Sequence, residues 1–433
     1  MNDTEVVEAE LTWTGESFES GIRIVIGEDG RIIRVGRLKR DPTRVLKGQA
    51  LLPGFVNAHS HAFQRGLRGL GERFPSGAGS FWSWRDAMYG LVEQLGPEDF
   101  LAVTTQAFLE MRAAGITTVG EFHYFHHGPA AHDFGYDRLV LKAARAARIR
   151  LVLLVAYYRT GGVGQPLSHG QRRFETLSPE IYWQNFDSLS PLIGPGQSLG
   201  CVVHSVRAAD REELKEIHTE SVTRGLPFHI HVEEQREEIA QCRAAYGMNP
   251  MALLLSTVGR AERVTAVHCT HTHPDDQKAF LDAGGTICIC PLTEANLGDG
   301  LPSLEGVPLD RICLGTDSNA RIDPVEEMRW LEYGQRLRRE SRGELRNGHG
   351  QVARTLFAVA TAAGADSLGV EAGRIAQGLW ADFAVIDLNS LALAGATPDT
   401  LLDALVFGAD SNVVTATCVG GQWQSHRPLS VGR

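Results

Sequence analysis

The sequence predicts an α/β fold: a (β/α)₈ TIM-like barrel with a small β domain formed from both chain ends. Three observations lead to this prediction. Strand-like and helix-like segments alternate through the middle of the chain, and the strand-like segments are apolar, which is typical of a parallel sheet covered on both faces. These apolar segments number eight, the number that closes such a barrel. Short β-branched segments occur near both ends of the chain.

Helical stretches, for example 97–115 and 208–225, separate most of the predicted barrel strands. These strands are expected at 51–59, 116–122, 150–158, 198–204, 226–232, 263–268, 285–291 and 311–316. The alternative is an open doubly wound sheet, which often carries a glycine-rich phosphate-binding turn after its first strand. Here the first strand ends in His-Ser-His instead, which favours the closed barrel.

The two chain ends are expected to meet in one domain, with the barrel inserted between them. Residues 1–50 contain short strands, with a hairpin signal between two β-branched runs. In the C-terminal part, 381–387 has the pattern of a strand, and 412–423 contains another strand with a Gly-Gly turn. The predicted domains are therefore a small β-sandwich-like domain of residues 1–50 and 376–433, and a barrel of residues 51–375.

The composition is that of an ordinary globular protein and argues against several classes of function. The chain has 433 residues, of which 43% are hydrophobic and 22% are charged. Its formal net charge is -10 and it has no long Lys/Arg run, so no nucleic-acid partner is expected. The acidic N-terminal segment has no apolar core, and no run of about 18 apolar residues exists, so neither a signal peptide nor a membrane span is expected. Seven Cys without a Cys-x-x-Cys pair favour a reducing, cytoplasmic compartment.

Histidines close several predicted strands, at the end where the active sites of such barrels lie. His59 and His61 close the first strand. Because residues two apart on a strand point to the same side, both can reach one ion. His229 and His231 close the fifth strand, and their spacing alone does not choose between them as a ligand.

Acidic residues near the strand ends fit both a catalytic and a structural role. Glu234 stands three residues after His231 and could lie beside a metal-bound water, but Glu233 and Glu234 also suit a solvated helix start. Asp317 follows the eighth strand and could simply cap the next helix. Since His268 and other histidines close earlier strands, we expect Asp317 to face the same ion.

These motifs resemble those of the amidohydrolase superfamily, in its mononuclear deaminase-like branch, over nearly the whole chain. They run from PGFVNAHSH at 53–61 to GLWADFAVID at 378–387. The resemblance implies one divalent ion, and zinc suits several His and one Asp. No Lys closes 198–204, where binuclear members commonly use a carboxylated Lys, which favours a single ion. The implied ligands are His59, His61, His231 and Asp317, with His268 beside the metal-bound water.

A finer resemblance is to the formimidoylglutamate deiminases, enzymes of histidine degradation. It rests on motifs beyond the generic metal ligands: HSHAFQRG at 59–66, FWSWR at 81–85, EFHY at 121–124, HSVR at 204–207 and PLTEANLGDG at 291–300. The resemblance implies hydrolysis of N-formimino-L-glutamate to N-formyl-L-glutamate and ammonia. A homodimer is common in this family and is expected here.

The substrate of that family has two carboxylates, which need cations and hydrogen-bond donors. Arg85 and Arg207 could each hold one carboxylate through a bidentate fork, although either could instead form a surface salt bridge. Gln64, Tyr124 and His204 can donate further hydrogen bonds. These five residues are the expected substrate-binding set.

The aromatic cluster at 81–84 precedes Arg85 and suggests that 71–90 is a loop acting as a lid over the site.

In the expected mechanism, Asp317 accepts a proton from an activated water that His268 orients. Glu234 protonates the departing nitrogen as general acid and base. Two alternatives stay open: the same fold acting on another C=N substrate, such as a guanine, adenosine-like or triazine compound, and a non-catalytic scaffold.

Overall fold

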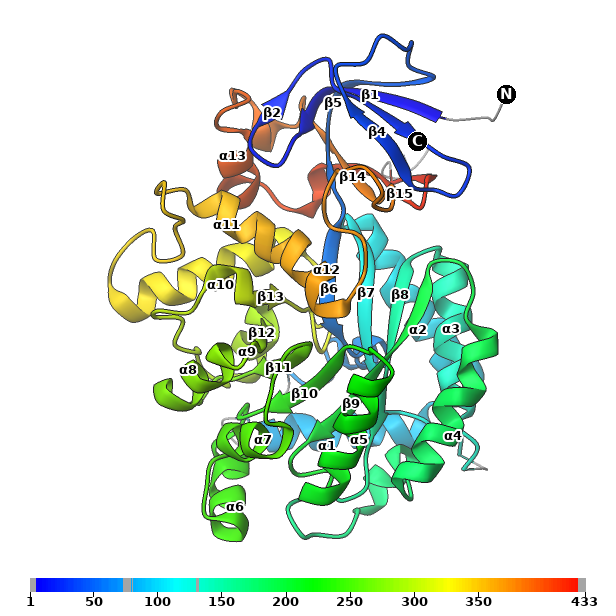
Figure 1. Cartoon of the computed structure of the whole chain (residues 1–433), viewed down its shortest axis with the longest axis vertical. Coiled ribbons are helices and arrows are strands. Elements are labelled where there is room, and N and C mark those ends of the chain that lie inside the picture. Colours follow the sequence, from blue (N-terminus) through cyan, green and yellow to red (C-terminus); the bar gives the residue numbers. More distant parts are fainter. Residues whose placement is uncertain (1–4, 73–78, 80, 130–131, 427–433) are drawn as a thin grey trace.

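The structure, a computed structural model, describes residues 5–72, 79, 81–129 and 132–426, and its main feature is a parallel barrel (Figure 1). The barrel strands lie side by side in chain order, and all their pairings are parallel. They are β6 (Phe55–Ser60), β7 (Ile116–His123), β8 (Arg150–Tyr157), β9 (Gln197–Ser205), β10 (Phe228–Val232), β11 (Val264–His268), β12 (Thr286–Ile289) and β13 (Ile312–Leu314). A parallel bridge joins Ser60, at the end of β6, to Asp317, just after β13, so the barrel is nearly closed and the predicted fold is confirmed.

Helices surround the barrel, and most follow the strand after which they were expected (Figure 1). Between the strands come α1 (Phe81–Gln94), α2 (Pro97–Ala113), α3 (Gly135–Ala147), α4 (Pro179–Leu189), α5 (Arg211–Thr223), α6 (Arg236–Tyr246), α7 (Pro250–Val258), α8 (Pro274–Asp282) and α9 (Pro291–Leu297). After the last strand come α10 (Pro324–Arg339), α11 (Val352–Ala358) and α12 (Gly364–Leu368). Pro in the first turn begins many of these helices, because its missing N–H costs no hydrogen bond there.

A second sheet is built from both ends of the chain and lies at one end of the barrel (Figure 1). It is antiparallel except for the parallel pair β1 and β5. Its strands are β1 (Glu5–Trp13), β2 (Phe18–Glu19), β3 (Arg23–Ile26), β4 (Ile32–Gly36), β5 (Arg44–Pro53), β14 (Phe383–Asp387), β15 (Val414–Val419) and β16 (Gln422–Ser425). One further helix, α13 (Leu401–Gly408), lies between β14 and β15 in the sequence. Apolar residues from both chain ends, such as Val7, Leu51 and Phe383, share one small core.

The chain passes from this sheet into the barrel at Gly54. The single strand expected over 51–59 is therefore two strands, since 51–53 end β5 and 55–59 belong to β6. A Cβ atom on Gly54 would lie 2.1 Å from Oγ1 of Thr117, so only glycine allows this close passage between the two sheets. The small sheet thus abuts the amino ends of the barrel strands and leaves their carboxyl ends free for a site.

A buried ion pair also joins the two sheets. Arg150, at the start of β8, donates from Nε to Oδ2 of Asp382 at 2.6 Å and from Nη2 to Oδ1 at 3.0 Å. The two side chains are 5% and 1% exposed, and Gly420 N–H donates to the same carboxylate at 2.7 Å. Removing one member would leave the other charge buried without a counter-ion, which is the costly case for a buried pair.

We therefore expect Asp382→Asn to lower the free energy of unfolding by about 3–5 kcal/mol in urea titrations. Asp366→Asn is the control, because Asp366 pairs with Arg374 at the surface, with side chains 60% and 47% exposed. An exposed pair of this kind contributes about 0–1 kcal/mol. Equal losses in the two variants would contradict the structural role of Asp382.

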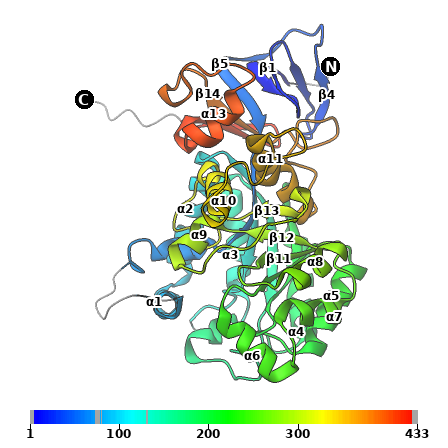
Figure 2. The ribbon, with the colours of Figure 1, turned by 90° about the vertical axis from the view of Figure 1, so that its left-hand side faces the viewer.

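The predicted lid is partly wrong. Residues 81–90 are not a loop but belong to helix α1, which stands at one side of the barrel (Figure 2). Residues 73–78 and 80 of the predicted lid lie outside the described residues.

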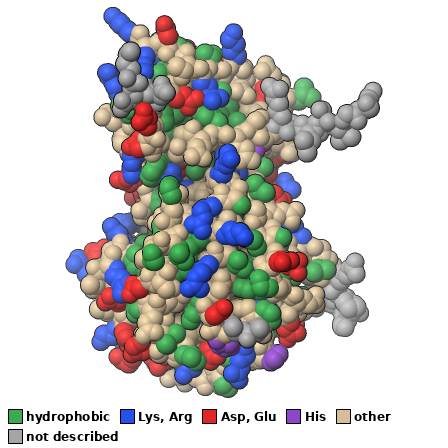
Figure 3. Space-filling model, turned by 90° about the vertical axis from the view of Figure 1, so that its right-hand side faces the viewer, with side chains coloured by type: hydrophobic (Ala, Val, Ile, Leu, Met, Phe, Trp, Pro, Cys, Tyr) green, Lys and Arg blue, Asp and Glu red, His purple; other side chains and the backbone are tan. Residues whose placement is uncertain are grey.

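All seven Cys are buried and free. Among the described residues, none of the helices combines the length and apolar character needed to cross a membrane. Side chains of both charges occur over the face seen in Figure 3.

Candidate metal centre and active site

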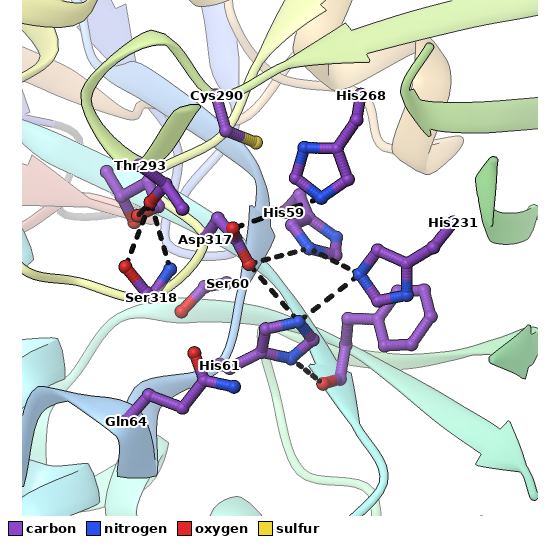
Figure 4. Close-up of polar contacts among 12 residues, drawn as sticks. His59, Ser60, His61, Gln64, His231, His268, Cys290, Thr293, Asp317 and Ser318 are labelled. Atoms are coloured by element: carbon purple, nitrogen blue, oxygen red, sulfur yellow. Dashed lines mark hydrogen bonds and ion pairs between the residues drawn. The ribbon is translucent and has the colours of Figure 1, made fainter. Parts of the chain in front are cut away.

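Three imidazoles and one carboxylate converge at the carboxyl ends of the barrel strands (Figure 4). Nε2 of His59 and Nε2 of His61 each lie 3.2 Å from Oδ1 of Asp317. Nε2 of His231 lies 3.2 Å from Nε2 of His59 and 3.4 Å from Nε2 of His61. Ligand atoms about 2.0–2.1 Å from one tetrahedral zinc ion would be separated by about 3.3 Å, so the donor spacing fits such an ion.

The protonation of these imidazoles also fits a metal ion. Nδ1 of His61 donates to the carbonyl of Phe122 at 2.7 Å, and Nδ1 of His231 donates to the carbonyl of His204 at 2.9 Å. Each Nε2 therefore points a lone pair at the centre of the cluster. Burial lowers the pKa of His61 to about 4 and that of His231 well below 6.5, so both rings are neutral near pH 7. Such lone pairs facing a carboxylate repel one another unless a cation lies between them.

The turn that carries His59 and His61 is fixed by its neighbours on both sides. His61 N–H donates to the carbonyl of Asp317 at 2.9 Å, across the point where the barrel closes. On the other side, the buried carboxyl of Glu121 accepts the N–H of Ala62 at 2.6 Å. Burial raises the pKa of Glu121 to about 8. Closure of the barrel and the end of β7 together hold the two histidines in place.

His268 and Glu234 flank the cluster on the side of the pocket. Nε2 of His268 lies 3.9 Å from Oδ2 of Asp317, and its Nδ1 lies 3.4 Å from Oε1 of the buried Glu294. Burial alone would lower the pKa of His268, but Glu234, Glu294 and Asp317 raise it to about 10. Burial raises the pKa of Glu234, and Asp317 adds to this rise, whereas His268 and Arg207 oppose it. The arrangement places a proton donor and a proton acceptor beside the metal cluster.

A cavity of about 570 Å³, including its open mouth, leads from this cluster to the outside. All five residues expected to bind the substrate line it: Gln64, Arg85, Tyr124, His204 and Arg207. Five of the six expected catalytic and metal-binding residues line its inner end: His61, His231, Glu234, His268 and Asp317. His59 completes the metal cluster behind them and is fully buried.

The polar groups of the pocket are held in defined orientations. Nε2 of Gln64 donates to the hydroxyl of Tyr124 at 2.6 Å, which leaves the phenol proton available to a ligand. The ring of His204 packs edge-to-face on Tyr124. Burial, and next the charge of Arg207, lower the pKa of His204 well below 6.5, so this ring is neutral. The side chain of Arg207 is 14% exposed.

Several other pocket residues were not predicted from the sequence. Helix α1 contributes Phe81, Trp84, Met88 and Tyr89 beside the predicted Arg85. Their spacing of three and four residues is that of one face of a helix, a pattern that could have identified both the helix and its inward side. Tyr158, Phe174 and Leu297 also line the cavity and come from segments far apart in the chain.

Some polar residues near the strand ends do not enter the pocket. His229 lies deeper in the barrel, with Nε2 3.3 Å from the carbonyl of Ser367. Glu233 is fully buried rather than solvated, and its Oε1 accepts the N–H of Met251 at the start of α7. Nε2 of His123 lies 3.1 Å from Oδ1 of Asp137, and His123 does not belong to the group of candidate metal ligands around Asp317.

Comparison with known proteins agrees with this geometry. The sequence pattern of the amidohydrolase family matches residues 50–424. A formimidoylglutamate deiminase from Pseudomonas aeruginosa is 38% identical over 424 residues, which cover 96% of this chain and 93% of that protein. A 5-methylthioadenosine/S-adenosylhomocysteine deaminase from Clostridium tetani is 25% identical and covers 87% of this chain and 81% of that protein.

Solved structures show the same architecture. The crystal structure of an amidohydrolase from Brucella melitensis superposes with a TM-score of 0.88 at 32% identity, and covers 98% of this chain and 96% of that one. An adenosine deaminase from Xanthomonas campestris with bound zinc has a TM-score of 0.82 at 22% identity, over 99% and 94% of the two chains, and shares the fold. From the family pattern over most of its length and these relatives, the chain belongs to the amidohydrolase family and is a hydrolase that acts on C–N bonds.

Proposed function

We propose that this enzyme hydrolyses N-formimino-L-glutamate to N-formyl-L-glutamate and ammonia, a step of histidine degradation, with one zinc ion as its cofactor. Water adds to the formimino carbon, the bond from that carbon to the terminal nitrogen breaks, and this nitrogen leaves as ammonia. The relative from Pseudomonas aeruginosa carries the name of this activity and matches nearly the whole chain.

The observation that carries the proposal is that one cavity holds both the candidate metal ligands and two guanidinium groups. The His and Asp cluster lies at the inner end, and the guanidinium groups of Arg85 and Arg207 line the same cavity. A ligand with a small C=N head and two carboxylates matches both sets of groups at once, because arginine binds carboxylates through paired hydrogen bonds. A purine or a triazine has no carboxylate to offer these arginines.

The side chains at the inner end can move the required protons. A bound divalent ion would supply Lewis-acid chemistry that makes a water nucleophilic near pH 7. Asp317 accepts a proton from this water, and His268, 3.9 Å from the carboxylate, orients the attacking oxygen. Glu234 then donates a proton to the departing nitrogen, which suits a buried carboxyl whose pKa is raised.

A second candidate is a deaminase of an aromatic C=N substrate, a guanine, adenosine-like or triazine compound. The aromatic side chains Trp84, Tyr89, Tyr124, Tyr158 and Phe174 in the cavity favour it, since such rings can stack on a heterocycle. These rings also pack on one another, for example Phe174 on Tyr124 at 4.8 Å between centroids, which leaves less of their faces to a ligand.

The test is ammonia release by the purified, zinc-loaded protein. N-formimino-L-glutamate is compared with N-formimino-glycine, guanine and adenosine under the same conditions. We expect rapid release from the glutamate compound, slow release from the glycine compound, and none from the ring amines. Activity on a ring amine alone would replace the substrate but keep the metal chemistry.

A further inference from the structure

We propose that Glu238 is a positioning residue that holds the guanidinium of Arg207 and the turn of Glu234 in one arrangement. The proposal rests on the proposed function, because it assumes that Arg207 binds a carboxylate of the substrate. Glu238 lies in the first turn of α6 and does not line the cavity.

The first observation is a buried charge pair behind the substrate pocket. Oε1 of Glu238 lies 3.7 Å from Nε of Arg207, and the two side chains are 1% and 14% exposed. Within the described part of the chain, neither of these two atoms has a hydrogen-bond partner. The Glu238 carboxylate therefore lies on the Nε side of the guanidinium, and Arg207 itself lines the cavity.

The second observation concerns the other oxygen of the same carboxyl group. Oε2 of Glu238 accepts the N–H of Glu233 at 2.9 Å. Glu233 has a φ of 55°, the left-handed region that a residue with a Cβ rarely adopts, so this turn needs an external hold. Glu234 is the next residue in the chain. The Glu238 carboxyl that pairs with Arg207 therefore also stabilises, through the Glu233 N–H, the turn that carries the proton donor Glu234.

Glu238 thus links the group that recognises the substrate to the group that donates the proton. Arg207 comes from the loop after β9, and Glu234 from the loop after β10. The pairing of these two strands ends before both residues, at His231 and Ser205. The Glu238 carboxylate is held by the Glu233 N–H and faces the Arg207 guanidinium. A negative charge held in this way keeps the long, flexible arginine side chain in one rotamer, which lowers the entropy cost of binding the substrate.

The direction in which Glu238→Gln changes the affinity for an anion separates positioning from simple electrostatics. Removing a negative charge near an anion site would by itself strengthen anion binding. If Glu238 positions Arg207, Glu238→Gln must instead weaken anion binding. The amide oxygen of Gln can still accept the Glu233 N–H, so this variant keeps the brace and changes the charge.

The experiment measures glutarate binding by calorimetry and turnover of N-formimino-L-glutamate for the zinc-loaded enzyme. Both are run at about pH 8.5, because burial raises the pKa of Glu238 to about 7 and the group must be ionised. We expect Glu238→Gln to raise the Kd for glutarate and the KM for the substrate about tenfold, with kcat within about threefold. Glu238→Ala, which also removes the brace, should lower kcat as well. Glu237→Gln, on the exposed side of the same helix turn, is the matched control and should change neither.

A double-mutant cycle completes the test. In an Arg207→Met background, Glu238→Gln should have no further effect on the Kd for glutarate, because the group it positions is gone. A lower Kd in the single variant, or the same effect in both backgrounds, would overturn the proposal. An enzyme that binds glutarate and shows this coupling but does not hydrolyse N-formimino-L-glutamate would overturn only the proposed function. A wild-type enzyme that does not bind glutarate would overturn the role of Arg207 and with it the positioning by Glu238.

Discussion

Replacing Glu234 with Gln is expected to lower kcat by about 10²–10⁴ while the bound metal stays at the wild-type level. The amide has the same shape but carries no acidic proton, so the departing nitrogen must leave without protonation, and a general acid contributes a factor of this size. KM should change little, because the carboxyl is not among the groups expected to hold the substrate carboxylates. Steady-state ammonia release and elemental analysis of the same preparation measure the two quantities.

The neighbouring acid supplies a matched control. Glu233 is also buried, but its carboxyl accepts the N–H of Met251 and does not line the cavity. Glu233→Gln keeps an acceptor there and should keep kcat within about threefold. If Glu234→Gln retained near-normal turnover, or if Glu233→Gln lost as much, the assignment of the proton donor would be wrong.

The second large effect is expected at His231. Its Nε2 is one of the four donors of the metal cluster, so His231→Ala should bind less than a tenth of the wild-type metal and lose at least about 10³-fold in turnover. The measurement is metal content after dialysis against a weak chelator, followed by ammonia release. Added zinc should not restore activity, because three remaining donors hold the ion less tightly.

The control lies two residues earlier on the same strand. His229 is buried like His231, but it contacts the carbonyl of Ser367 and not the cluster. We expect His229→Ala to unfold at a lower temperature but to keep its metal. This pair of variants decides a question that the spacing of two histidines on one strand leaves open. Loss of metal from both variants would point to damage to the strand rather than to a ligand.

Much of the barrel could be predicted because its strands are buried on both faces and therefore read as apolar runs. The strands β7 and β8 are buried at every position, and β9 is buried through its centre. The convergence of His59, His61 and Asp317 could also be predicted, because the carboxyl ends of parallel strands meet at one edge of the barrel. The boundary at Gly54 could not be predicted, because one apolar run serves both sheets there.

The rest of the site depends on tertiary contacts that a linear pattern does not contain. Helix α1 was interpreted as a loop because its aromatic residues were read as a cluster in sequence and not at helical spacing. A solvated helix start was one of the readings left open for Glu233, but its carboxyl is buried and accepts the N–H of Met251 at the start of α7. The contact of Glu238 with Arg207 joins helix α6 to the loop after β9. The two residues lie about thirty positions apart, and nothing local in the sequence marks the contact.

The small sheet has a consequence for how the protein is made. Strand β5 pairs with β14, and Phe383 lies opposite Pro53 in that register. At translation rates of about 5–20 residues per second, β5 leaves the ribosome tens of seconds before its partner exists. Through that interval one edge of β5 is open, and an open strand edge is a template for association with other chains. The nascent protein is therefore open to association at this edge even after its last barrel strand has been made, and binding of a chaperone there would protect it. Slowing synthesis between β13 and β14 would prolong its exposure to aggregation.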